Sequence, residues 1–574
     1  MNIFENYLLK INRLIQQNKN ILELENIENL KSVNLEVPPE HFNFDLSSNI
    51  SLVLSKANKL NPKPLAENIK DLLLKNISDF EMIEIAGPGF LNIKLSKKGI
   101  ISNINNILKD KDNYGSKKSK KTFNIEFVSA NPTGPMHVGH CRGAIFGDVL
   151  SNLLLFNGNK VIKEYYINDY GKQIESFVKS VFLRLREIKY KEKFLIKEDL
   201  YPGEYIKEIA EDIINKNKNI KIESFEKSFD ELKKLSLNAS MSLIKNDLNE
   251  LGISHDNFFS ETVLVKKNLV KKVVENLKKK KYVEEGYLDP PKGESSKDWK
   301  KIKRLIFKSS SFGDDTDRAL QKNDGSWTYF ANDVAYHFDK INRKFDNLVN
   351  VLGADHTGYI KRISAAVSAL SENKVKLNCK VCQLVKLYKN GEPYKMSKRA
   401  GDFISVKELL SEVSKDSIRF MMLNRSSDVE LDFDFDNVVE KSKENPLYYV
   451  QYAYARIASV FRHLNKDLSS ELDIDSYDFR YSNDEIQILK KIAEWPKCID
   501  ISCNRLEPHR VAVYLYDLSS LFHSYWNLGK DNPDKRFINE QKKIDNDKLI
   551  FLKVISNVIK SGMNIIGVST PEKM

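Results

Sequence analysis

The sequence predicts an α/β domain built on a parallel sheet, with an α+β domain before it and an all-α domain after it. Three observations lead to this prediction. The middle of the chain alternates β-like runs with amphipathic helical stretches, which is typical of a parallel sheet. Residues 81–95 contain two β-like runs joined by a Gly-Pro-Gly turn signal. From about residue 405 the pattern is almost entirely helical.

Size and composition support several folded domains and a polyanionic partner. A chain of 574 residues is too long for one core, and its length predicts roughly three to five domains. The 41% apolar content excludes global disorder. Lys and Arg (91) outnumber Asp and Glu (79), and the resulting net charge of +12 favours a partner such as nucleic acid.

The sequence predicts a cytoplasmic protein without a membrane-spanning segment. Residues 1–20 predict an amphipathic helix rather than a signal peptide. We see no segment that approaches the roughly 20 apolar residues needed to cross a bilayer. Five cysteines, an odd number without disulfide-like spacing, fit a reducing compartment.

The first domain is expected over residues 1–112. It contains helical stretches around 2–30 and 62–76, followed by the two β-like runs of 81–95. The pattern changes at residue 122. A β-rich run (123–129) leads through a turn cluster to a helix over 137–156, and a second strand follows at 161–168.

The interval 170–300 is charged and helical, and we interpret it as an insertion between two halves of the α/β fold. The β-α pattern resumes with a strand that ends at Gly353 and a helix over 360–371. Cys379 and Cys382 have half of a zinc-ribbon spacing and open an apolar run, CQLVKLY, that predicts a strand. Because no second pair of zinc ligands lies nearby in the sequence, we expect no structural zinc.

Two short motifs carry the chemistry. His137-Val-Gly139-His140 lies where a strand turns into a helix, and helix N-termini attract phosphates. Gly139 leaves room for a nucleotide to approach. Lys395-Met-Ser-Lys398 places two compact cations in a loop that can close over the same phosphates. Together they predict joining of a carboxylate to ATP, with charge stabilisation on the departing pyrophosphate.

These motifs resemble those of class I aminoacyl-tRNA synthetases, and the surrounding sequence resembles the arginyl-tRNA synthetases in particular. The resemblance covers nearly the whole chain and becomes faint only in about 175–300. It rests on these segments: AGPGFLNI (86–93), EFVSANPTGPMHVGHCRGAIFGD, YYINDYGKQI (165–174), YFANDVAYH (329–337), DSIRFMMLNR (416–425), ENPLYYVQYAYARI (444–457) and IIGVSTPEKM (565–574).

The resemblance implies an arginine site. In the family pattern an acidic residue before the first motif falls on Glu126, and a Tyr-x-x-x-Asp falls on Tyr329 and Asp333. Paired carboxylates suit a guanidinium cation. Asn131 matches the position that holds the amino-acid end of the substrate. His356 stands where some members carry glutamine, so its contact is with arginine, with the ATP ribose or with neither.

The resemblance also implies the domain roles and the partners. Residues 1–112 correspond to a tRNA-contacting α+β domain, and 113–425 to a Rossmann-type catalytic domain whose parallel sheet is split by the insertion at about 175–300. Residues 426–574 correspond to a helical anticodon-binding domain. The implied substrates are L-arginine, ATP with Mg²⁺ and tRNA(Arg); the family norm is a monomer that forms the adenylate only with tRNA bound.

The remaining expectations concern residues rather than domains. Lys395 and Lys398 join His137 and His140 as the expected catalytic residues, and Gly139 and Gly353 complete the expected ATP site. Candidate tRNA contacts, which could stack on unpaired bases, form one aromatic-basic stretch: Tyr449, Gln451, Tyr452 and Arg456.

Two alternatives stay open at the level of sequence. The first is a class I synthetase for another amino acid, such as lysine, cysteine or glutamate. The acidic pocket, the N-terminal domain and the helical C-terminal region argue against it. The second is a catalytically silent tRNA-binding paralogue, which would be expected to have lost active-site residues, whereas both motifs are intact.

Overall fold

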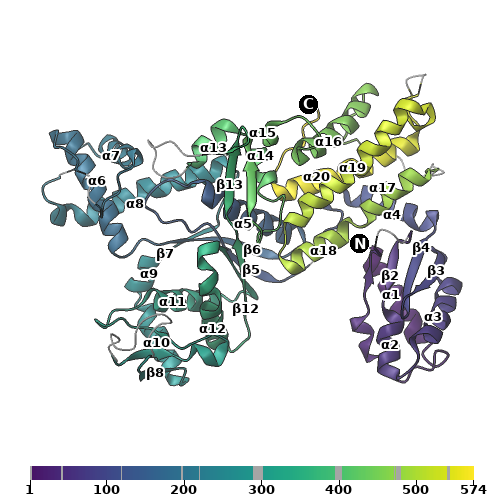
Figure 1. Cartoon of the computed structure of the whole chain (residues 1–574), viewed down its shortest axis with the longest axis horizontal. Helices are drawn as coiled ribbons and strands as arrows, with labels where there is room; N and C mark the ends of the chain where they lie inside the picture. The colour runs from purple at the N-terminus through teal and green to yellow at the C-terminus, as the bar shows by residue number, and fades with distance from the viewer. Residues whose placement is uncertain are drawn as a thin grey trace. The chain divides into compact units, whose positions relative to one another are not determined.

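In a computed structural model the chain folds into two compact units, residues 119–440 and residues 1–118 together with 441–574 (Figure 1). The residues that the structure describes are 3–39, 43–117, 119–195, 198–218, 220, 222–288, 302–394, 404–470, 472, 480–539 and 543–574.

A five-stranded parallel sheet forms the centre of the unit 119–440. Its strand order is β12-β11-β5-β6-β7. The strands are β5 (Thr122–Glu126), β6 (Lys160–Ile167), β7 (Asn257–Ser260), β11 (Asn347–Gly353) and β12 (Lys376–Cys382). Parallel strands need helical crossovers, and α5 (Val138–Phe156) and α12 (Ile360–Ser371) supply two of them.

The chain reverses direction across the sheet between β5 and β11. From β5 it continues to β6 on one side, and its other neighbour, β11, belongs to the later half of the sequence. Ligands bind outside the carboxyl ends of the strands at such a switch point. Glu126 ends β5 and Gly353 ends β11, so both predicted residues lie at this place in the sheet.

Further elements surround the sheet. Helix α11 (Tyr329–Asn342) precedes β11 and packs with α12 and α10 (Leu269–Lys279) over a shared hydrophobic core. Two small sheets are added, β10-β9-β8 and β14-β13-β15. The other elements of this unit are α9 (Glu261–Lys266), β8 (Val283–Gly286), β9 (Arg304–Phe307), η3 (Ser309–Phe312), β10 (Arg318–Ala319), η4 (Ala354–Tyr359), β13 (Val385–Lys389), β14 (Glu392–Pro393), α13 (Val406–Glu412), α14 (Lys415–Met421), β15 (Leu431–Asp434) and α15 (Phe435–Val439).

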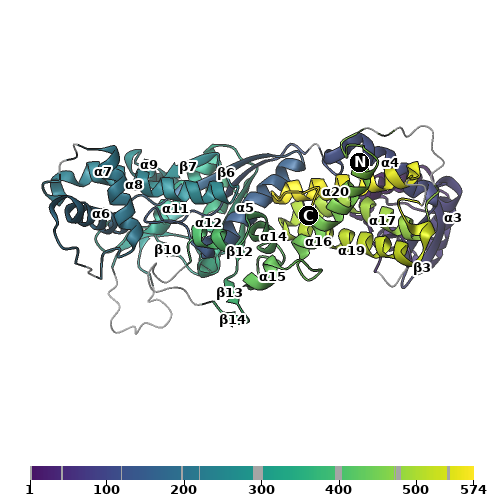
Figure 2. The same ribbon diagram turned by 90° about the horizontal axis from the view of Figure 1, so that it is seen from above.

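Three helices between β6 and β7 form a layer of their own. They are α6 (Lys172–Tyr190), α7 (Glu204–Lys216) and α8 (Phe225–Glu250), and they lie side by side in both views (Figures 1 and 2). Their apolar faces meet in a separate hydrophobic core. The predicted helical character of this interval is therefore confirmed for most of its length, but β7 and β8 are strands within it.

The unit formed by the two ends of the chain contains an antiparallel sheet and a set of helices. The sheet has the order β1-β2-β4-β3, with β1 (Leu35–Glu36), β2 (Leu46–Ser48), β3 (Phe80–Ala86) and β4 (Phe90–Leu95). The predicted pair of β-runs is confirmed as β3 and β4. The helices are α1 (Ile3–Gln17), η1 (Glu28–Ser32), α2 (Ile50–Asn58), α3 (Pro62–Asn76), α4 (Lys97–Asp110), η2 (Lys111–Asn113), α16 (Pro446–His463), α17 (Asn483–Ala493), α18 (Trp495–Arg505), α19 (His509–Asp531), η5 (Pro533–Lys535) and α20 (Asn546–Ile566).

Helix α20 is long and apolar enough in composition to cross a membrane, and it is the one such helix in the described part of the chain. Of its most apolar window, 89% is buried inside the protein. Its apolar residues therefore serve the core of this unit.

Two sequence predictions of secondary structure were wrong in part. The helical stretches expected around 2–30 are interrupted: α1 ends at Gln17, where the Asn18 side chain donates to the Leu14 carbonyl, and η1 begins at Glu28. The CQLVKLY run is divided between two sheets, since β12 ends at Cys382 and β13 pairs with β15. The almost entirely helical pattern expected from about residue 405 is confirmed for the described residues there, with β15 as a short strand among the helices.

Candidate active site

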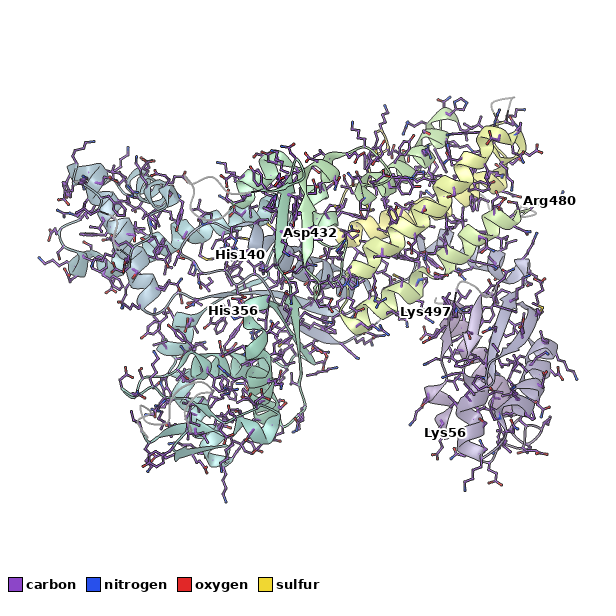
Figure 3. The ribbon with its side chains drawn as sticks, viewed as in Figure 1. Lys56, His140, His356, Asp432, Arg480 and Lys497 are labelled. Atoms are coloured by element: carbon purple, nitrogen blue, oxygen red, sulfur yellow. The ribbon has the colours of Figure 1, made fainter. Side chains whose placement is uncertain are left out.

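A cavity of about 720 Å³ opens at the carboxyl ends of β5, β6 and β11. It brings together eight of the residues predicted for the ATP and arginine sites. They are Glu126, Asn131, His137, Gly139, His140, Asp333, Gly353 and His356. Figure 3 labels His140, on the helix that follows β5, and His356, on the short helix η4 that follows β11.

The two histidines cap the helix α5. Nδ1 of His137 accepts a hydrogen bond from the Gly139 amide (3.1 Å), and Nδ1 of His140 accepts one from the His137 amide (3.3 Å). Because both Nδ1 atoms are acceptors, each neutral ring carries its proton on Nε2, which is then a donor. Burial lowers the pKa of both rings, that of His140 to about 4. The pair therefore offers neutral N–H donors at a helix N-terminus.

Gly139 is required by this cap as well as by any ligand. A Cβ at position 139 would lie 2.9 Å from Cε1 of the His137 ring. A side chain there would displace the ring whose Nδ1 holds the helix start.

The predicted lysines Lys395 and Lys398 lie outside the described residues. The segment that follows them is described and pairs with the first motif. The Val138 amide donates to the Ile404 carbonyl (2.9 Å), and the Val406 amide donates to the Met136 carbonyl (3.2 Å). This antiparallel pairing fixes Ser405 beside His137, ten positions after Lys395 in the sequence.

Two further residues, which sequence reasoning missed, anchor the first motif. Asp247 on α8 accepts a hydrogen bond from the Met136 amide (2.8 Å), and burial raises its pKa to about 6. Arg142 on α5 is buried, and its guanidinium donates to three backbone carbonyls of the β12–β13 and β15 loops at 2.6, 2.8 and 3.0 Å. No local sequence signal marks either role, since both partners are distant in the chain.

The acidic side of the cavity is formed by Glu126 and Asp333. Glu126 accepts hydrogen bonds from the ammonium of Lys340 (2.5 Å) and from the hydroxyl of Ser129 (3.4 Å). Asp333 on α11 accepts one from the hydroxyl of Tyr359, a cavity residue that the sequence did not indicate. Burial raises the pKa of Asp333 to about 7, although the Tyr359 hydrogen bond opposes this rise.

The backbone between Glu126 and Asn131 is strained. Val128 has φ of +70° and Ser129 has φ of +42°. A β-branched residue rarely adopts this left-handed conformation, and such strain concentrates at functional sites. The turn allows Ser129 to donate to Glu126 while its hydroxyl accepts from the Tyr166 amide (3.0 Å).

Three predicted arginine-site residues sit less centrally. Tyr329 is 71% exposed, its ring faces the Lys322 ammonium at 5.4 Å, and it does not line the cavity. Asn131 accepts a long hydrogen bond from the amide of Asn168 (3.4 Å). His356 lies at the rim on η4, with Nε2 3.4 Å from Asp355.

The candidate tRNA contacts lie on α16, and three of the four come together. The guanidinium of Arg456 lies 4.3 Å from the ring centre of Tyr452 and 2.8 Å from Nδ1 of His523. Tyr449 also packs against His523, with ring centres 4.3 Å apart. Gln451 points the other way: it is buried and donates to the Ser569 carbonyl (3.0 Å).

Within the described ranges, no group of three or more His, Cys, Asp or Glu side chains is arranged to hold a metal ion. Cys379 and Cys382 are both free thiols on β12.

Three family descriptions match the chain in succession. They are the "Arginyl tRNA synthetase N terminal domain" over residues 10–95, the "tRNA synthetases class I (R), catalytic domain" over 103–444 and the "DALR anticodon binding domain" over 450–574.

Full-length relatives agree with this succession. The chain is 59% identical over 580 residues to an arginine–tRNA ligase of Pelagibacter ubique and 44% identical over 588 residues to one of Bartonella bacilliformis; each match covers 100% of both chains. The solved arginyl-tRNA synthetase of Thermus thermophilus shares the fold, with a TM-score of 0.73 at 18% identity over 100% of both chains. The chain belongs to the arginyl-tRNA synthetase family, the arginine–tRNA ligases of class I.

Proposed function

We infer that the chain catalyses arginine + ATP + tRNA(Arg) → arginyl-tRNA(Arg) + AMP + pyrophosphate. The observation that carries this inference is one cavity at the switch point of the sheet, lined both by His137 and His140 and by Glu126 and Asp333. The histidine side suits phosphates, and the acidic side suits a guanidinium.

In the first step, an oxygen of the arginine carboxylate attacks the α-phosphorus of ATP, and pyrophosphate leaves. The Nε2 donors of His137 and His140 stabilise the charge that builds on the phosphates. Lys395 and Lys398 stabilise the departing pyrophosphate, a role consistent with the pairing of Ser405 beside His137. In the second step, a hydroxyl at the 3′ end of tRNA attacks the acyl carbon and AMP leaves.

Arginine is held at both ends. Glu126 and Asp333 accept from the guanidinium, and Tyr359 orients Asp333 through its hydroxyl. Asn131 holds the amino-acid end. Tyr329, exposed in the free protein, and His356, at the rim beside Gly353, contact the substrates once these are bound.

Residues 1–112 and 426–574 contact tRNA in this proposal, the latter at the anticodon, and 113–425 form the catalytic domain with an insertion at about 175–300. Tyr449, Tyr452 and Arg456 form an aromatic-cationic surface suited to unpaired bases, whereas Gln451 is buried on the other side of α16 and supports the helix packing. Mg²⁺ enters with ATP, because Mg²⁺ is usually bound by one or two carboxylates together with substrate phosphates. We expect a cytoplasmic monomer.

Three variants test these assignments. Asp333→Ala should raise the KM for arginine about 10- to 100-fold, because it removes charge-assisted hydrogen bonds to the guanidinium, and should leave the KM for ATP nearly unchanged. His140→Ala should lower kcat about 100-fold and leave the KM for arginine nearly unchanged. Equal effects of Asp333→Ala on both KM values would contradict the guanidinium contact. Lys398→Ala should also charge tRNA more slowly, and a wild-type rate would contradict its role.

A further inference from the structure

A row of polar residues crosses one face of the parallel sheet. Asn350 on β11 pairs in register with Glu126 on β5, Glu126 pairs with Glu164 on β6, and Glu164 pairs with Asn257 on β7. Residues in register on neighbouring strands point to the same face of a sheet. Four polar side chains therefore line one face of the sheet, where apolar residues would be expected.

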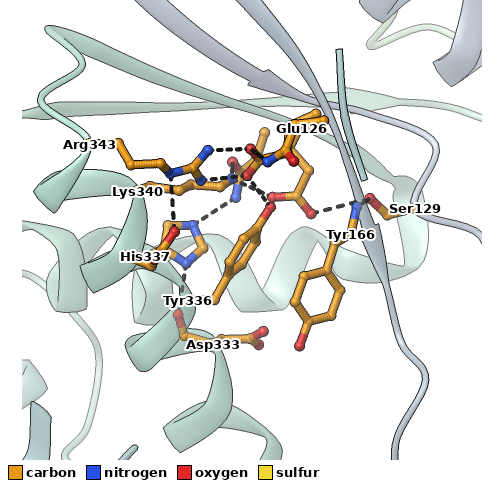
Figure 4. Close-up of polar contacts among 12 residues, drawn as sticks. Glu126, Ser129, Tyr166, Asp333, Tyr336, His337, Lys340 and Arg343 are labelled. Carbon is orange, nitrogen blue, oxygen red and sulfur yellow. Dashed lines mark hydrogen bonds and ion pairs between the residues drawn. The ribbon is translucent and has the colours of Figure 1, made fainter. Parts of the chain in front are cut away.

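Helix α11 covers this row with charged and polar side chains (Figure 4). Its C-cap residue Arg343 donates to both oxygens of Glu164, at 2.5 and 2.8 Å, and forms a closed ion pair. Tyr336 donates to Glu164 as well (2.7 Å). Glu164 is thus paired within the row, and it does not line the cavity.

Lys340, on the same helix, contacts Glu126, a carboxylate of the cavity, rather than Glu164. Its side chain is 0% exposed, and its ammonium donates to Oε2 of Glu126 (2.5 Å) and to Oδ1 of Asn350 (3.2 Å). The amide of Asn350 contacts Nε2 of His337 (3.0 Å), whose Nδ1 faces the Asp333 carbonyl (2.9 Å). A buried cation therefore touches one of the two carboxylates proposed to bind the substrate guanidinium.

The contacts of Glu126 leave one oxygen for substrate. Oε2 is held by the ammonium of Lys340, whereas Oε1 accepts the long hydrogen bond from Ser129 (3.4 Å). A charged donor such as a guanidinium would replace a contact of this length with a stronger one.

We propose that Lys340 is a positioning residue that sets the charge of the arginine site. Its ammonium holds one oxygen of Glu126 and balances one of the two carboxylates, Glu126 and Asp333. The pair therefore lacks one positive charge, which the guanidinium of the substrate supplies. This inference rests on the proposed arginine site. In the free protein below about pH 7, a proton on Asp333 fills the place of the missing charge. Arginine then binds with release of that proton, so Glu126, Asp333 and Lys340 together with the proton or the guanidinium carry no net charge in either state.

The surroundings of Asp333 determine how readily this proton leaves. The titratable groups that face its carboxyl are Tyr359 from η4, Glu126 from β5, Tyr166 from β6, Glu261 from α9 and Lys340 from its own helix. Burial and the charges of Glu126 and Glu261 raise the pKa of Asp333, and the charge of Lys340 lowers it. Removal of Lys340 alone should therefore make arginine binding require a higher pH.

The test is the pH dependence of the KM for arginine, measured on the full chain with saturating ATP and tRNA. In the wild type, the KM should fall as the pH rises through about 7. Lys340→Met should move the midpoint of this fall upward by about one pH unit or more. Glu126→Gln should move it downward, and the Lys340→Met/Glu126→Gln double variant should return it close to the wild-type value.

Two controls assign the effect. Asp333→Asn should abolish the transition. Arg343→Met removes a cation from the C-terminal end of the same helix, but its partner is Glu164, so the midpoint should not move. An unchanged midpoint in Lys340→Met, or an equal shift in Arg343→Met, would overturn the inference. Should Lys340→Met fail to fold, the double variant, which leaves no unpaired charge at this contact, is compared with Glu126→Gln. The inference then requires the midpoint to return from the lower value of Glu126→Gln to the wild-type value in the double variant.

Calorimetry separates this inference from the proposed function. Binding of arginine near pH 7, measured in buffers of different ionisation enthalpy, should release protons in the wild type and release more in Lys340→Met. A chain that behaves in this way and yet forms no arginyl-tRNA would contradict the proposed function alone. An active chain without proton release would contradict the role of Lys340 alone.

Discussion

Replacement of Asp333 by asparagine should make the free protein more stable while it impairs arginine use. Asp333 is buried, and its pKa is raised to about 7 by burial, with further increases from the charges of Glu126 and Glu261. At pH 8 the folded protein must hold this carboxylate ionised in an unfavourable place. An amide of nearly the same shape keeps an acceptor for the Tyr359 hydroxyl and removes the charge.

The magnitude follows from the pKa. The folded-state value of about 7 lies above the ordinary 3.8, so the unfolded chain loses its proton at lower pH than the folded chain does. Stability contributed by the protonated form is complete below about pH 4 and is lost as the pH rises through 7. At about 1.4 kcal/mol per pKa unit, the loss above pH 7 is at most about 4 kcal/mol. Asp333→Asn should recover about 2–4 kcal/mol there, and about 1–2 kcal/mol at pH 5.

Thermal unfolding of the wild type and of Asp333→Asn, without substrates, measures this gain. A recovery of this size should raise the Tm of the catalytic unit by about 4–8 °C at pH 8.5, and by less at pH 5. The same variant should show a KM for arginine about 10- to 100-fold higher. A Tm at pH 8.5 equal to or below that of the wild type would refute the reasoning, because it would mean that Asp333 is not a strained, buried acid.

Three other predictions concern the first motif. Arg142→Met should lower the free energy of unfolding by about 3–5 kcal/mol in chemical denaturation, because three backbone carbonyls lose a charged, buried donor; a change below 1 kcal/mol would contradict this. Asp247→Ala should lower kcat about 10-fold or more, with little change in the KM for arginine, since Asp247 holds the Met136 amide next to His137. Steady-state kinetics measure both constants, and an unaffected kcat would contradict this role. The His140 ring, with its pKa lowered to about 4, should show no transition between pH 6 and 8 in an NMR titration, and a midpoint near 6.5 would contradict its burial.

Local signals in the sequence predicted much of the central fold. The strand-turn-helix-strand pattern around His137 is present as β5, α5 and β6, and the strand that ends at Gly353 is β11. Hydrophobic periodicity and turn residues are properties of neighbouring positions, so they can be read from one segment at a time. The same holds for the histidine cap, whose two rings are three positions apart.

The rest depends on pairings between distant segments. Lys340 is a helix residue in an unremarkable position until the register of two strands, β5 and β11, brings Glu126 and Asn350 beside it. Arg142 and Asp247 reach backbone groups more than a hundred positions away. Tyr359 completes the acidic site in the free protein, whereas Tyr329, indicated by the family pattern, is exposed there. Such roles become visible only when the strand order is known.

The central claim is that the cavity at the switch point couples adenylate chemistry to recognition of a guanidinium. Aminoacylation of total tRNA by the purified full chain, with arginine, lysine, cysteine or glutamate offered separately, tests it most directly. We predict ATP-dependent charging with arginine and at least about 1000-fold less with lysine, because a compact ammonium cannot replace the fork of guanidinium donors at two carboxylates. Charging with lysine in preference to arginine would contradict the account, as would the absence of charging with every amino acid.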